Sequence, residues 1–287
     1  MINVKKEYFL KRIILSLVFL LQITLLFAQK NFSFVFLPDL HLRPDSSVLA
    51  TFDRVSGQIN RLKPSFALTG GDMIYTAKSV DDKKAEILFD LMDSQLKKLK
   101  MPVFLTMGNH ETVGITAESG IDSSNPMWGE RMYEKRYNES YYTFNYSGWK
   151  FFILDGIRIR EKEKDYTSGV DPEQIEWLKS ELSSTDINTP IVLVIHTPLI
   201  NPHAISDSNA DALSRNSEDV LDLFSKHDLR IVLQGHNHIY MNLFINGIHY
   251  ISGGSSAYGT RPEDNGFILV KIKKSAEKIT FIPVLKN

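Results

Sequence analysis

Side chains of the kinds that bind metal ions recur in short blocks, each directly after an apolar run typical of a β-strand. Because ligands of open α/β sheets bind at the carboxyl ends of the strands, we predict that these side chains meet in one crevice. Carboxylates and imidazoles together suit a pair of metal ions bridged by a shared carboxylate, and Asp72 is the natural bridge. The blocks are Asp39-Leu40-His41, Gly71-Asp72, Gly108-Asn109-His110-Glu111, Val194-Ile195-His196 and Gly235-His236-Asn237-His238.

For each of these residues taken alone, a helix cap or a satisfied polar group at a strand end is the commoner explanation. Taken jointly, they favour a metal site, and five of the eight histidines belong to the set. Of the other three, His227 and His249 are assigned to the surface or to packing, while His203 is expected in an exposed loop with substrate contact as the alternative. The glycines before Asp72, Asn109 and His236 are predicted to let the backbone turn tightly.

The composition is that of a globular protein. The 287 residues include 33 Lys plus Arg, 34 Asp plus Glu and 43% hydrophobic residues, which excludes disordered, collagenous and coiled-coil chains. A formal net charge of −1 gives no general attraction to nucleic acid or to an anionic membrane. The absence of cysteine rules out a disulfide partner, a thiolate metal site and a cysteine nucleophile.

The first half of the chain alternates apolar runs with helical patterns. Strands are predicted at 32–37, 66–69 and 102–107, and helices at 48–62 and 87–100. This β-α-β-α-β order requires a parallel sheet with right-handed crossovers. The buried face of the second helix is predicted from Ile87, Leu88, Leu91, Leu96 and Leu99.

The second half reads as strand-rich, and two packed sheets with helices outside explain it better than one doubly wound sheet. A hairpin of 141–146 and 149–154 turns at Ser147-Gly148, and an irregular loop covers 155–171. A helix begins at Pro172 with Asp171 as N-cap, and another lies near 218–226. Further strands are predicted at 191–195 and 229–233, and short antiparallel strands at 239–245, 248–252, 267–272 and 279–285.

Residues 1–28 have the features of a secretory signal peptide. Lys5, Lys6, Lys11 and Arg12 precede an apolar run over 13–27, and Ala28 offers a small residue for cleavage. An uncleaved membrane anchor is the alternative, although spanning the hydrocarbon takes about 20 apolar residues. We therefore expect one domain over 29–287, exported to a bacterial periplasm or secreted, with membrane contact only through an uncleaved signal segment.

The five blocks, in this order, resemble the calcineurin-like metallophosphoesterase superfamily, including its purple acid phosphatase-like and cyclic-nucleotide phosphodiesterase-like members. The likeness extends from Asp39 to His238. It implies an α/β fold, a four-layer α/β/β/α sandwich of two mixed sheets with the metal site at the strand C-terminal ends.

The resemblance also implies a role for each block residue. Two divalent or mixed-valence ions of Mn, Fe or Zn would activate a hydroxide that attacks phosphorus. His110 would stand beside the scissile phosphate as the catalytic residue, stabilising charge or protonating the leaving oxygen. One ion would be held by Asp39, His41, Asp72 and His238, and the other by Asp72, Asn109, His196 and His236.

These features together predict an exported phosphohydrolase acting on a small phosphate ester, with phosphomonoesters preferred. The alternative is a phosphodiesterase acting on cyclic nucleotides, nucleic acid or lipid-linked substrates, although the charge gives no strong nucleic-acid signal. A non-catalytic metal-binding protein is the distant alternative.

Several residues near the blocks carry open expectations. Asp72-Met73-Ile74-Tyr75 is similar to the Asp-x-x-Tyr block of purple acid phosphatases, which lack a histidine at the position of His41. The Tyr75 ring is therefore expected to pack against the sheet edge or to line the pocket, with metal ligation as the alternative. Glu111 is expected to be structural, through a carboxylate that could hydrogen-bond a ligating histidine. The segment 112–140 could gate the site or cover the sheet edge, and Arg158, Arg160 and Arg261 are expected on the surface, with phosphate binding as the alternative.

Overall fold

The computed structural model describes residues 31–202, 213–257, 265–273 and 276–284. The predicted signal peptide, His203 and Arg261 lie outside the described residues. Within the described ranges, no helix is long and apolar enough to cross a membrane.

The first sheet has five strands in the order β13-β12-β1-β2-β3. Strands β1, β2 and β3 are parallel and are connected by helices α2 (Ser46–Leu62) and α3 (Asp82–Leu96), so the predicted β-α-β-α-β unit is confirmed. β12 pairs antiparallel with β1 and with β13. The strands span Phe32–Leu37 (β1), Phe66–Thr69 (β2), Val103–Phe104 (β3), Gly266–Lys273 (β12) and Ala276–Pro283 (β13).

The second sheet has six strands in the order β10-β11-β9-β8-β5-β4. Its four inner strands are parallel, while β4 and β10 pair antiparallel at the edges. The predicted hairpin turns at Ser147 and Gly148, where φ is 49° and 81°. The strands span Tyr142–Tyr146 (β4), Trp149–Leu154 (β5), Ile191–Ile195 (β8), Leu229–Gln234 (β9), Tyr240–Ile245 (β10) and Ile248–Gly253 (β11).

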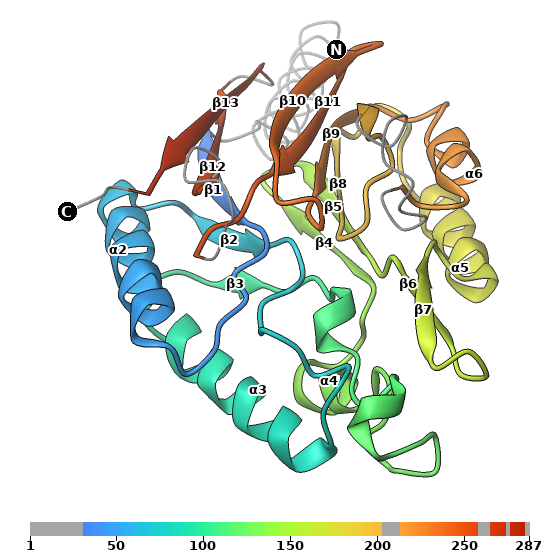
Figure 1. Ribbon diagram of the computed structural model, residues 1–287. Helices are drawn as coiled ribbons and strands as arrows, with labels where there is room; N and C mark the ends of the chain where they lie inside the picture. The colour runs from blue at the N-terminus through green and yellow to red at the C-terminus, as the bar shows by residue number, and fades with distance from the viewer. Residues whose placement is uncertain (1–30, 203–212, 258–264, 274–275, 285–287) are drawn as a thin grey trace, which may run out of the picture.

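The two sheets pack face to face, and helices cover the outer face of each (Figure 1). Helices α2 and α3 lie on the first sheet, and α5 (Pro172–Ser183) and α6 (Ser217–Leu223) on the second. Aromatic rings fill the space between the sheets: Phe34 stacks on Phe66 at 5.2 Å and meets Phe151 edge-on at 5.6 Å. The four-layer α/β/β/α sandwich with two mixed sheets is therefore confirmed.

The buried face of α3 agrees with the prediction in part, since Leu88 and Leu96 pack against the core as predicted. Ile87 is 65% exposed, whereas Ala85, Phe89 and Met92 are buried. Asp81 caps the helix by accepting a hydrogen bond from the Lys84 amide, which begins the helix at Asp82. The stripe that then faces the sheet has the i, i+4, i+7 spacing of one helix face, and the apolar residue at 87 falls outside it.

The third strand is shorter than predicted, because β3 consists only of Val103–Phe104. Beyond it the Thr106 amide donates to the Oγ1 of Thr69, 2.9 Å away, so a side chain replaces the ladder partner. The chain thereby leaves the sheet and turns toward the next block.

The segment 155–171, predicted as an irregular loop, contains a hairpin of β6 (Ile157–Arg160) and β7 (Asp165–Ser168). Its apolar side chains pack on Ile115 and Trp128 of the preceding segment. That segment also forms α4 (Arg131–Tyr137) and buries Tyr133 in the core, which favours covering of the sheet edge over gating.

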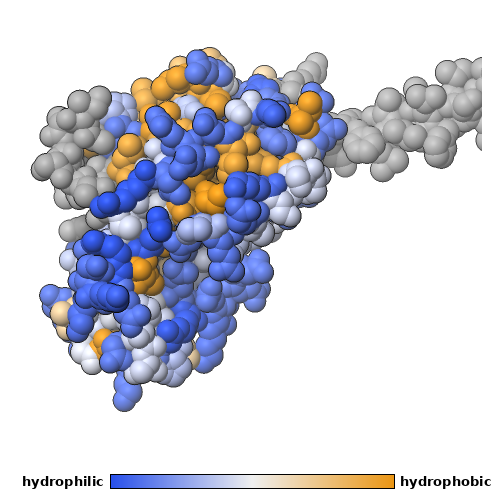
Figure 2. All heavy atoms as spheres, turned by 90° about the vertical axis from the view of Figure 1, so that its right-hand side faces the viewer, coloured by the Kyte–Doolittle hydropathy of each residue, from blue (hydrophilic) through white to orange (hydrophobic). Residues whose placement is uncertain are grey.

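The C-terminal strands divide between the two sheets, which the prediction of a simple antiparallel series did not anticipate. β10 and β11 join the second sheet, with β11 parallel to β9, while β12 and β13 return to the first. Seen from the side of α5 and α6, hydrophobic residues gather in the upper part of the surface and hydrophilic residues below (Figure 2). Among the exposed hydrophobic residues are Phe244 and Ile245 of β10.

Candidate metal centre

The predicted blocks all follow the carboxyl ends of parallel strands. Asp39 and His41 follow β1, and Asp72 follows β2. Asn109 begins a short 3-10 helix after β3, His196 follows β8, and the histidines at 236 and 238 follow β9. The two sheets thus present their carboxyl ends to one place, and the predicted convergence of these side chains is observed.

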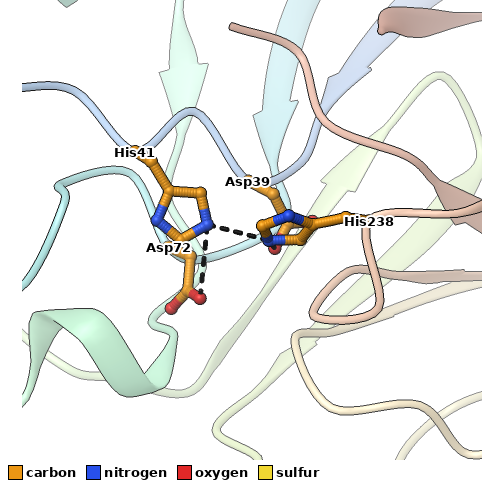
Figure 3. Close-up of side chains that lie close together, drawn as sticks. All are labelled: Asp39, His41, Asp72 and His238. Carbon is orange, nitrogen blue, oxygen red and sulfur yellow. Dashed lines mark hydrogen bonds and ion pairs between the residues drawn. The ribbon is translucent and has the colours of Figure 1, made fainter. Parts of the chain in front are cut away.

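The first group of donor atoms comprises Asp39, His41, Asp72 and His238. One ligand atom from each lies within 4.8 Å of all the others. His41 Nε2 is 2.9 Å from His238 Nε2 and 3.8 Å from Asp72 Oδ2, and His238 Nε2 is 3.4 Å from Asp39 Oδ1. Figure 3 shows the four side chains pointing toward one another, Asp39 and His41 from one loop and Asp72 and His238 from two others.

The second group comprises Asp72, His196 and His236, again within 4.8 Å of one another. His196 Nε2 lies 3.3 Å from Asp72 Oδ1 and 3.2 Å from His236 Nδ1. The amide oxygen of Asn109 stands 3.1 Å from the first of these nitrogens and 3.2 Å from the second. All four residues predicted for this group therefore come together.

These spacings fit cations. Two nitrogen atoms bound to one metal at about 2.1 Å stand roughly 3 Å apart, which is the separation found in both histidine pairs. The two oxygens of Asp72 face different groups, Oδ1 toward His196 and Oδ2 toward His41, as a bridging carboxylate would. Nitrogen and oxygen donors without sulfur suit Mn, Fe or Zn.

The electrostatics of the cluster keep its carboxylate ionised. Although burial raises the pKa of Asp72, the neighbouring histidines, His196 foremost, hold it well below its ordinary value. Burial lowers the pKa of His41 and of His236 to about 4, so both imidazoles are neutral and can bind metal at pH 7. Burial opposes protonation of His196, but the charge of Asp72 raises its pKa to about 10, so binding a metal there releases a proton.

The backbone at the donors is strained. Asp39, His41, Asp72, His236 and His238 have φ values of 50°, 46°, 51°, 72° and 54°, in the left-handed region. Residues with a Cβ pay about 1–3 kcal/mol for such a conformation and concentrate at functional sites. These five are half of the ten such residues in the described ranges.

The glycines act partly as predicted. Gly71, with φ of 81°, makes the tight turn, and a Cβ there would lie 2.6 Å from His196 Nδ1. Gly108 has a φ of −120°, which any residue adopts, so the predicted turn role is wrong there. A side chain at Gly108 would instead lie 2.4 Å from the Asp72 amide, and one at Gly235 would lie 2.8 Å from Asp39 Oδ2. At these two positions close approach excludes a Cβ.

Glu111 has the structural role that was predicted, but its hydrogen-bond partners are backbone amides and not a histidine. Its carboxylate accepts four backbone N–H groups, from Gly108 at 2.8 Å, Asp72 at 2.9 Å, Met73 at 2.7 Å and Ile74 at 3.1 Å. Burial, with the charge of Asp72, raises the pKa of this fully buried group to about 7, opposed by these hydrogen bonds. Glu111 therefore ties the block at 108 to the loop that carries the bridging aspartate, instead of orienting a histidine.

Other contacts orient the donors. His196 donates from Nδ1 to the carbonyl oxygen of Gly70 at 2.7 Å, which turns Nε2 toward the metal donors. The backbone amide of His236 donates to Asp39 Oδ1 at 3.0 Å, and the Ser255 hydroxyl donates to the Asp39 carbonyl at 2.7 Å. The sequence did not predict this contact of Ser255, because nothing in its local pattern marks a partner 216 residues away.

His110 stands beside Asp72, the residue that the two groups share. Its Nδ1 hydrogen-bonds the carbonyl oxygen of Tyr75, and its Nε2 lies 3.7 Å from Asp72 Oδ2. The ring is partly exposed and lines a cavity of about 470 Å³. Burial lowers the pKa of His110, and the positive charge of Lys78 adds to that effect.

The rim of this cavity includes Tyr75, Thr76, Lys78, Ser79 and Tyr166. The Tyr75 ring is 41% exposed and lies 4.7 Å from the Arg43 guanidinium, in agreement with the predicted pocket-lining role. Lys78 and Tyr166 were not found from the sequence, since the first is a lone lysine in a loop and the second lies in the unpredicted hairpin.

The other singled-out residues lie where a surface role places them. Arg158 pairs with Asp171 at 2.7 Å, and Arg160 pairs with Asp165 at 3.2 Å. Asp171 occupies the predicted N-cap position of α5. Its carboxylate accepts a hydrogen bond from Arg158 Nε and makes no capping hydrogen bond.

A family model described as calcineurin-like phosphoesterase matches residues 32–240. The chain belongs to the calcineurin-like phosphoesterase family. A Xenopus tropicalis protein named "Manganese-dependent ADP-ribose/CDP-alcohol diphosphatase" is 24% identical over 258 residues, covering 72% of this chain and 73% of the relative. A Psychrobacter arcticus protein named "Probable cyclic nucleotide phosphodiesterase" is 23% identical over 242 residues, covering 80% and 81%.

The fold is also found in a solved structure of a dimetal phosphatase from Danio rerio. The two chains align with a TM-score of 0.67 and 13% identity, covering 89% of this chain and 97% of the other. Together with the family match, these relatives show that the protein is a metallophosphoesterase, a hydrolase acting on phosphate esters.

Proposed function

We propose that this protein is an exported, binuclear metal-dependent phosphoesterase that cleaves phosphodiesters or diphosphates. The observation that supports this most is the position of Asp72, whose two carboxylate oxygens face two separate groups of donors. His110 Nε2 stands 3.7 Å from Oδ2 of the same carboxylate. We assign Asp39, His41, Asp72 and His238 to one ion, and Asp72, Asn109, His196 and His236 to the other.

When bound, two cations supply a hydroxide nucleophile at neutral pH and neutralise the phosphoryl oxygens. The residues of the chain complete the reaction. His110, whose Nδ1 is held by the Tyr75 carbonyl, turns Nε2 into the cavity, where it can protonate the leaving oxygen. The rim from Tyr75 to Ser79, with Tyr166, forms the wall against which the leaving group rests.

The choice of substrate is supported by the cavity and by the named activities of the relatives. The cavity continues past His110 to a rim of aromatic, hydroxyl and lysine side chains, which leaves room for a group on each side of the phosphate. The relatives are named as a diphosphatase and as a probable cyclic nucleotide phosphodiesterase. The preference for monoesters remains a prediction that neither name supports.

Manganese is the ion we would test first, since the Xenopus relative is named as manganese-dependent. Iron and zinc suit the same donors. We infer export from residues 1–28 alone. We further propose that the substrate is a small phosphate ester and not nucleic acid, and that residues 29–287 form one domain.

Elemental analysis and hydrolysis assays on one purified sample test this proposal. We expect about two metal ions per chain and hydrolysis of bis(p-nitrophenyl) phosphate or ADP-ribose that a chelator abolishes. Asp72→Asn should lower activity by about 10³-fold or more and release metal, because it weakens both groups. Asp222→Asn, an exposed carboxylate on α6, is the control. A chain that binds no metal and hydrolyses none of these esters would favour the binding-protein alternative.

Export is tested separately by expressing the full chain in a bacterial host. Recovery outside the cytoplasm of a product lacking residues 1–28 would support the signal peptide. Membrane-bound full-length protein would support the anchor, and a full-length cytoplasmic product would contradict export.

A further inference from the structure

Lys78 contributes a positively charged side chain to the rim of the cavity. The side chain is partly buried and lines the same cavity as His110. Among the described residues, its Nζ forms no ion pair with a carboxylate, and it lies instead 5.3 Å from the centre of the Tyr166 ring. A partly desolvated cation of this kind is a binding element for an anion.

The backbone fixes Lys78 relative to the catalytic histidine. The Ala77 amide donates to the carbonyl oxygen of His110 at 2.7 Å, and the Lys78 carbonyl accepts the Thr116 amide at 3.0 Å. The Thr116 hydroxyl also donates to the Ser79 hydroxyl at 3.1 Å. Lys78 thus stands on a stretch of chain anchored on both sides, unlike a solvated surface lysine.

The aromatic partner is equally fixed. Tyr166 is only 8% exposed and packs in one cluster with Ile115 and Ile157. Its ring therefore supports the lysine stem and holds the ammonium at the cavity wall. The β6–β7 hairpin, which carries this ring, gains a role in the site through this contact.

The charges at the site indicate what the lysine binds. The positive charge of two divalent ions would exceed the negative charge of Asp39 and Asp72. This excess suffices to balance the single negative charge of a diester phosphate. Lys78 belongs to neither donor group, so its charge is available to a second anion beside the phosphoryl group under attack. A diphosphate carries such an anion in the adjoining phosphoryl group.

Resting on the proposed function, we propose that Lys78, supported by Tyr166, binds the second phosphoryl group of a diphosphate substrate and makes the enzyme prefer diphosphates to simple diesters. In the reaction, a water that has lost one proton to solvent bonds through its oxygen to the first phosphorus, and the bond from that phosphorus to the bridging oxygen breaks. The bridging oxygen leaves with the second phosphoryl group and takes the proton from His110. Lys78 stabilises the negative charge that develops on this leaving phosphate.

The first test compares two substrates in the full-length, manganese-loaded protein. In Lys78→Met, the ratio of kcat/KM for ADP-ribose to kcat/KM for bis(p-nitrophenyl) phosphate should fall about 10-fold or more, as expected for loss of a charge-assisted contact. Lys78→Arg should restore much of the ratio. Lys83→Met, an exposed lysine on α3 outside the cavity, should leave the ratio unchanged.

The second test measures binding without turnover. Calorimetry with α,β-methylene-ADP, which is not hydrolysed, should show about 10-fold weaker binding to Lys78→Met, while binding of AMP changes about 2-fold or less. An unchanged substrate ratio together with unchanged α,β-methylene-ADP affinity would overturn the inference. Hydrolysis of both esters in that case would leave the proposed function standing, whereas failure of that function would appear as absent metal and absent hydrolysis in the unmodified protein.

Discussion

Two buried acidic clusters lie at carboxyl ends of strands in this protein, and they have opposite chemistry. Asp39 and Asp72 follow β1 and β2, and Asp155 follows β5 in the same manner. Asp155 is 4% exposed and hydrogen-bonds with Glu130, the residue that precedes α4. The first cluster contains five nearby imidazoles, whereas the Asp155 carboxylate, which also accepts hydrogen bonds from the Ile157 amide and from Ser140, has no imidazole among its partners in the described residues and meets the carboxyl group of Glu130.

The neighbours explain the difference. Histidines hold Asp72 ionised in spite of burial. At the second cluster, burial raises the pKa of Glu130 to about 9 and that of Asp155 to about 7, so this pair keeps a proton near neutral pH. A buried carboxylate surrounded by imidazoles can attract a metal ion, while one that meets another carboxyl group retains a proton. Position at a strand end is therefore insufficient to identify a metal ligand.

Among variants that leave every proposed metal ligand in place, the largest expected effect comes from removing the imidazole of His110. His110→Ala should lower kcat by about 10²-fold or more while both metal ions are retained, because only the proton donor is lost. Steady-state kinetics and elemental analysis measure the two quantities. His249→Ala is the control, and undiminished kcat in a fully loaded His110→Ala enzyme would remove the assigned role.

Replacing the amide-binding carboxylate should chiefly affect stability. Glu111→Gln keeps the shape of the side chain but replaces one accepting oxygen by an NH2 group, which faces the backbone N–H groups as a second donor. We therefore expect a loss of about 2–3 kcal/mol in the free energy of unfolding. Metal affinity should fall about 10-fold as the loop of Asp72 loosens. Denaturant titration and metal titration test this, with Glu176→Gln on α5 as the exposed control. Unchanged unfolding would show that the four amide contacts contribute nothing.

The proton-sharing pair should make stability fall as pH rises. The pKa of Glu130 in the folded chain, about 9, exceeds its ordinary 4.5, so between these values the folded chain binds a proton that the unfolded chain has lost. The contribution of this bound proton to the free energy of unfolding is complete below pH 4.5 and is lost as the pH rises toward 9. Glu130→Gln cannot titrate and should melt a few degrees higher than the unmodified protein at pH 9 and about equally at pH 5. If the difference in melting temperature between Glu130→Gln and the unmodified protein were the same at every pH, the shared proton would be contradicted.

The smallest effect is expected at Tyr75. Tyr75→Phe keeps the ring beside Arg43, so metal content should be unchanged and activity should change less than about 2-fold. Visible spectra of the iron-loaded protein provide a second measurement. A visible absorption band that disappears with the hydroxyl would identify Tyr75 as a ligand and revive the purple acid phosphatase alternative.

Much of the fold and of the donor set was predictable from local patterns. Apolar runs located most of the strands, and the β-α-β-α-β order required a parallel sheet. Because parallel strands end at one edge, polar residues directly after them had to converge, which identified the eight block residues before any distance was known. Their assignment to particular ions is a proposal that metal analysis must test.

What local patterns could not show depends on partners distant in the sequence. The face of α3 was decided by its cap and by the sheet beneath it, which left Ile87 exposed. The division of the C-terminal strands between two sheets depends on the pairing of β12 with β1 and of β11 with β9. The sequences of such short strands are similar and do not specify with which strand each one pairs.

By itself, the sequence determined which chemical groups stand at the strand ends, because side-chain type and strand periodicity are local properties. Only the tertiary structure decided what those groups do. Glu111 became a ligand for four amides and Asp155 a proton-sharing acid, since contacts across tens of residues set their surroundings. Lys78 likewise joined the pocket wall because the fold brings Tyr166, 88 residues away in the chain, against it.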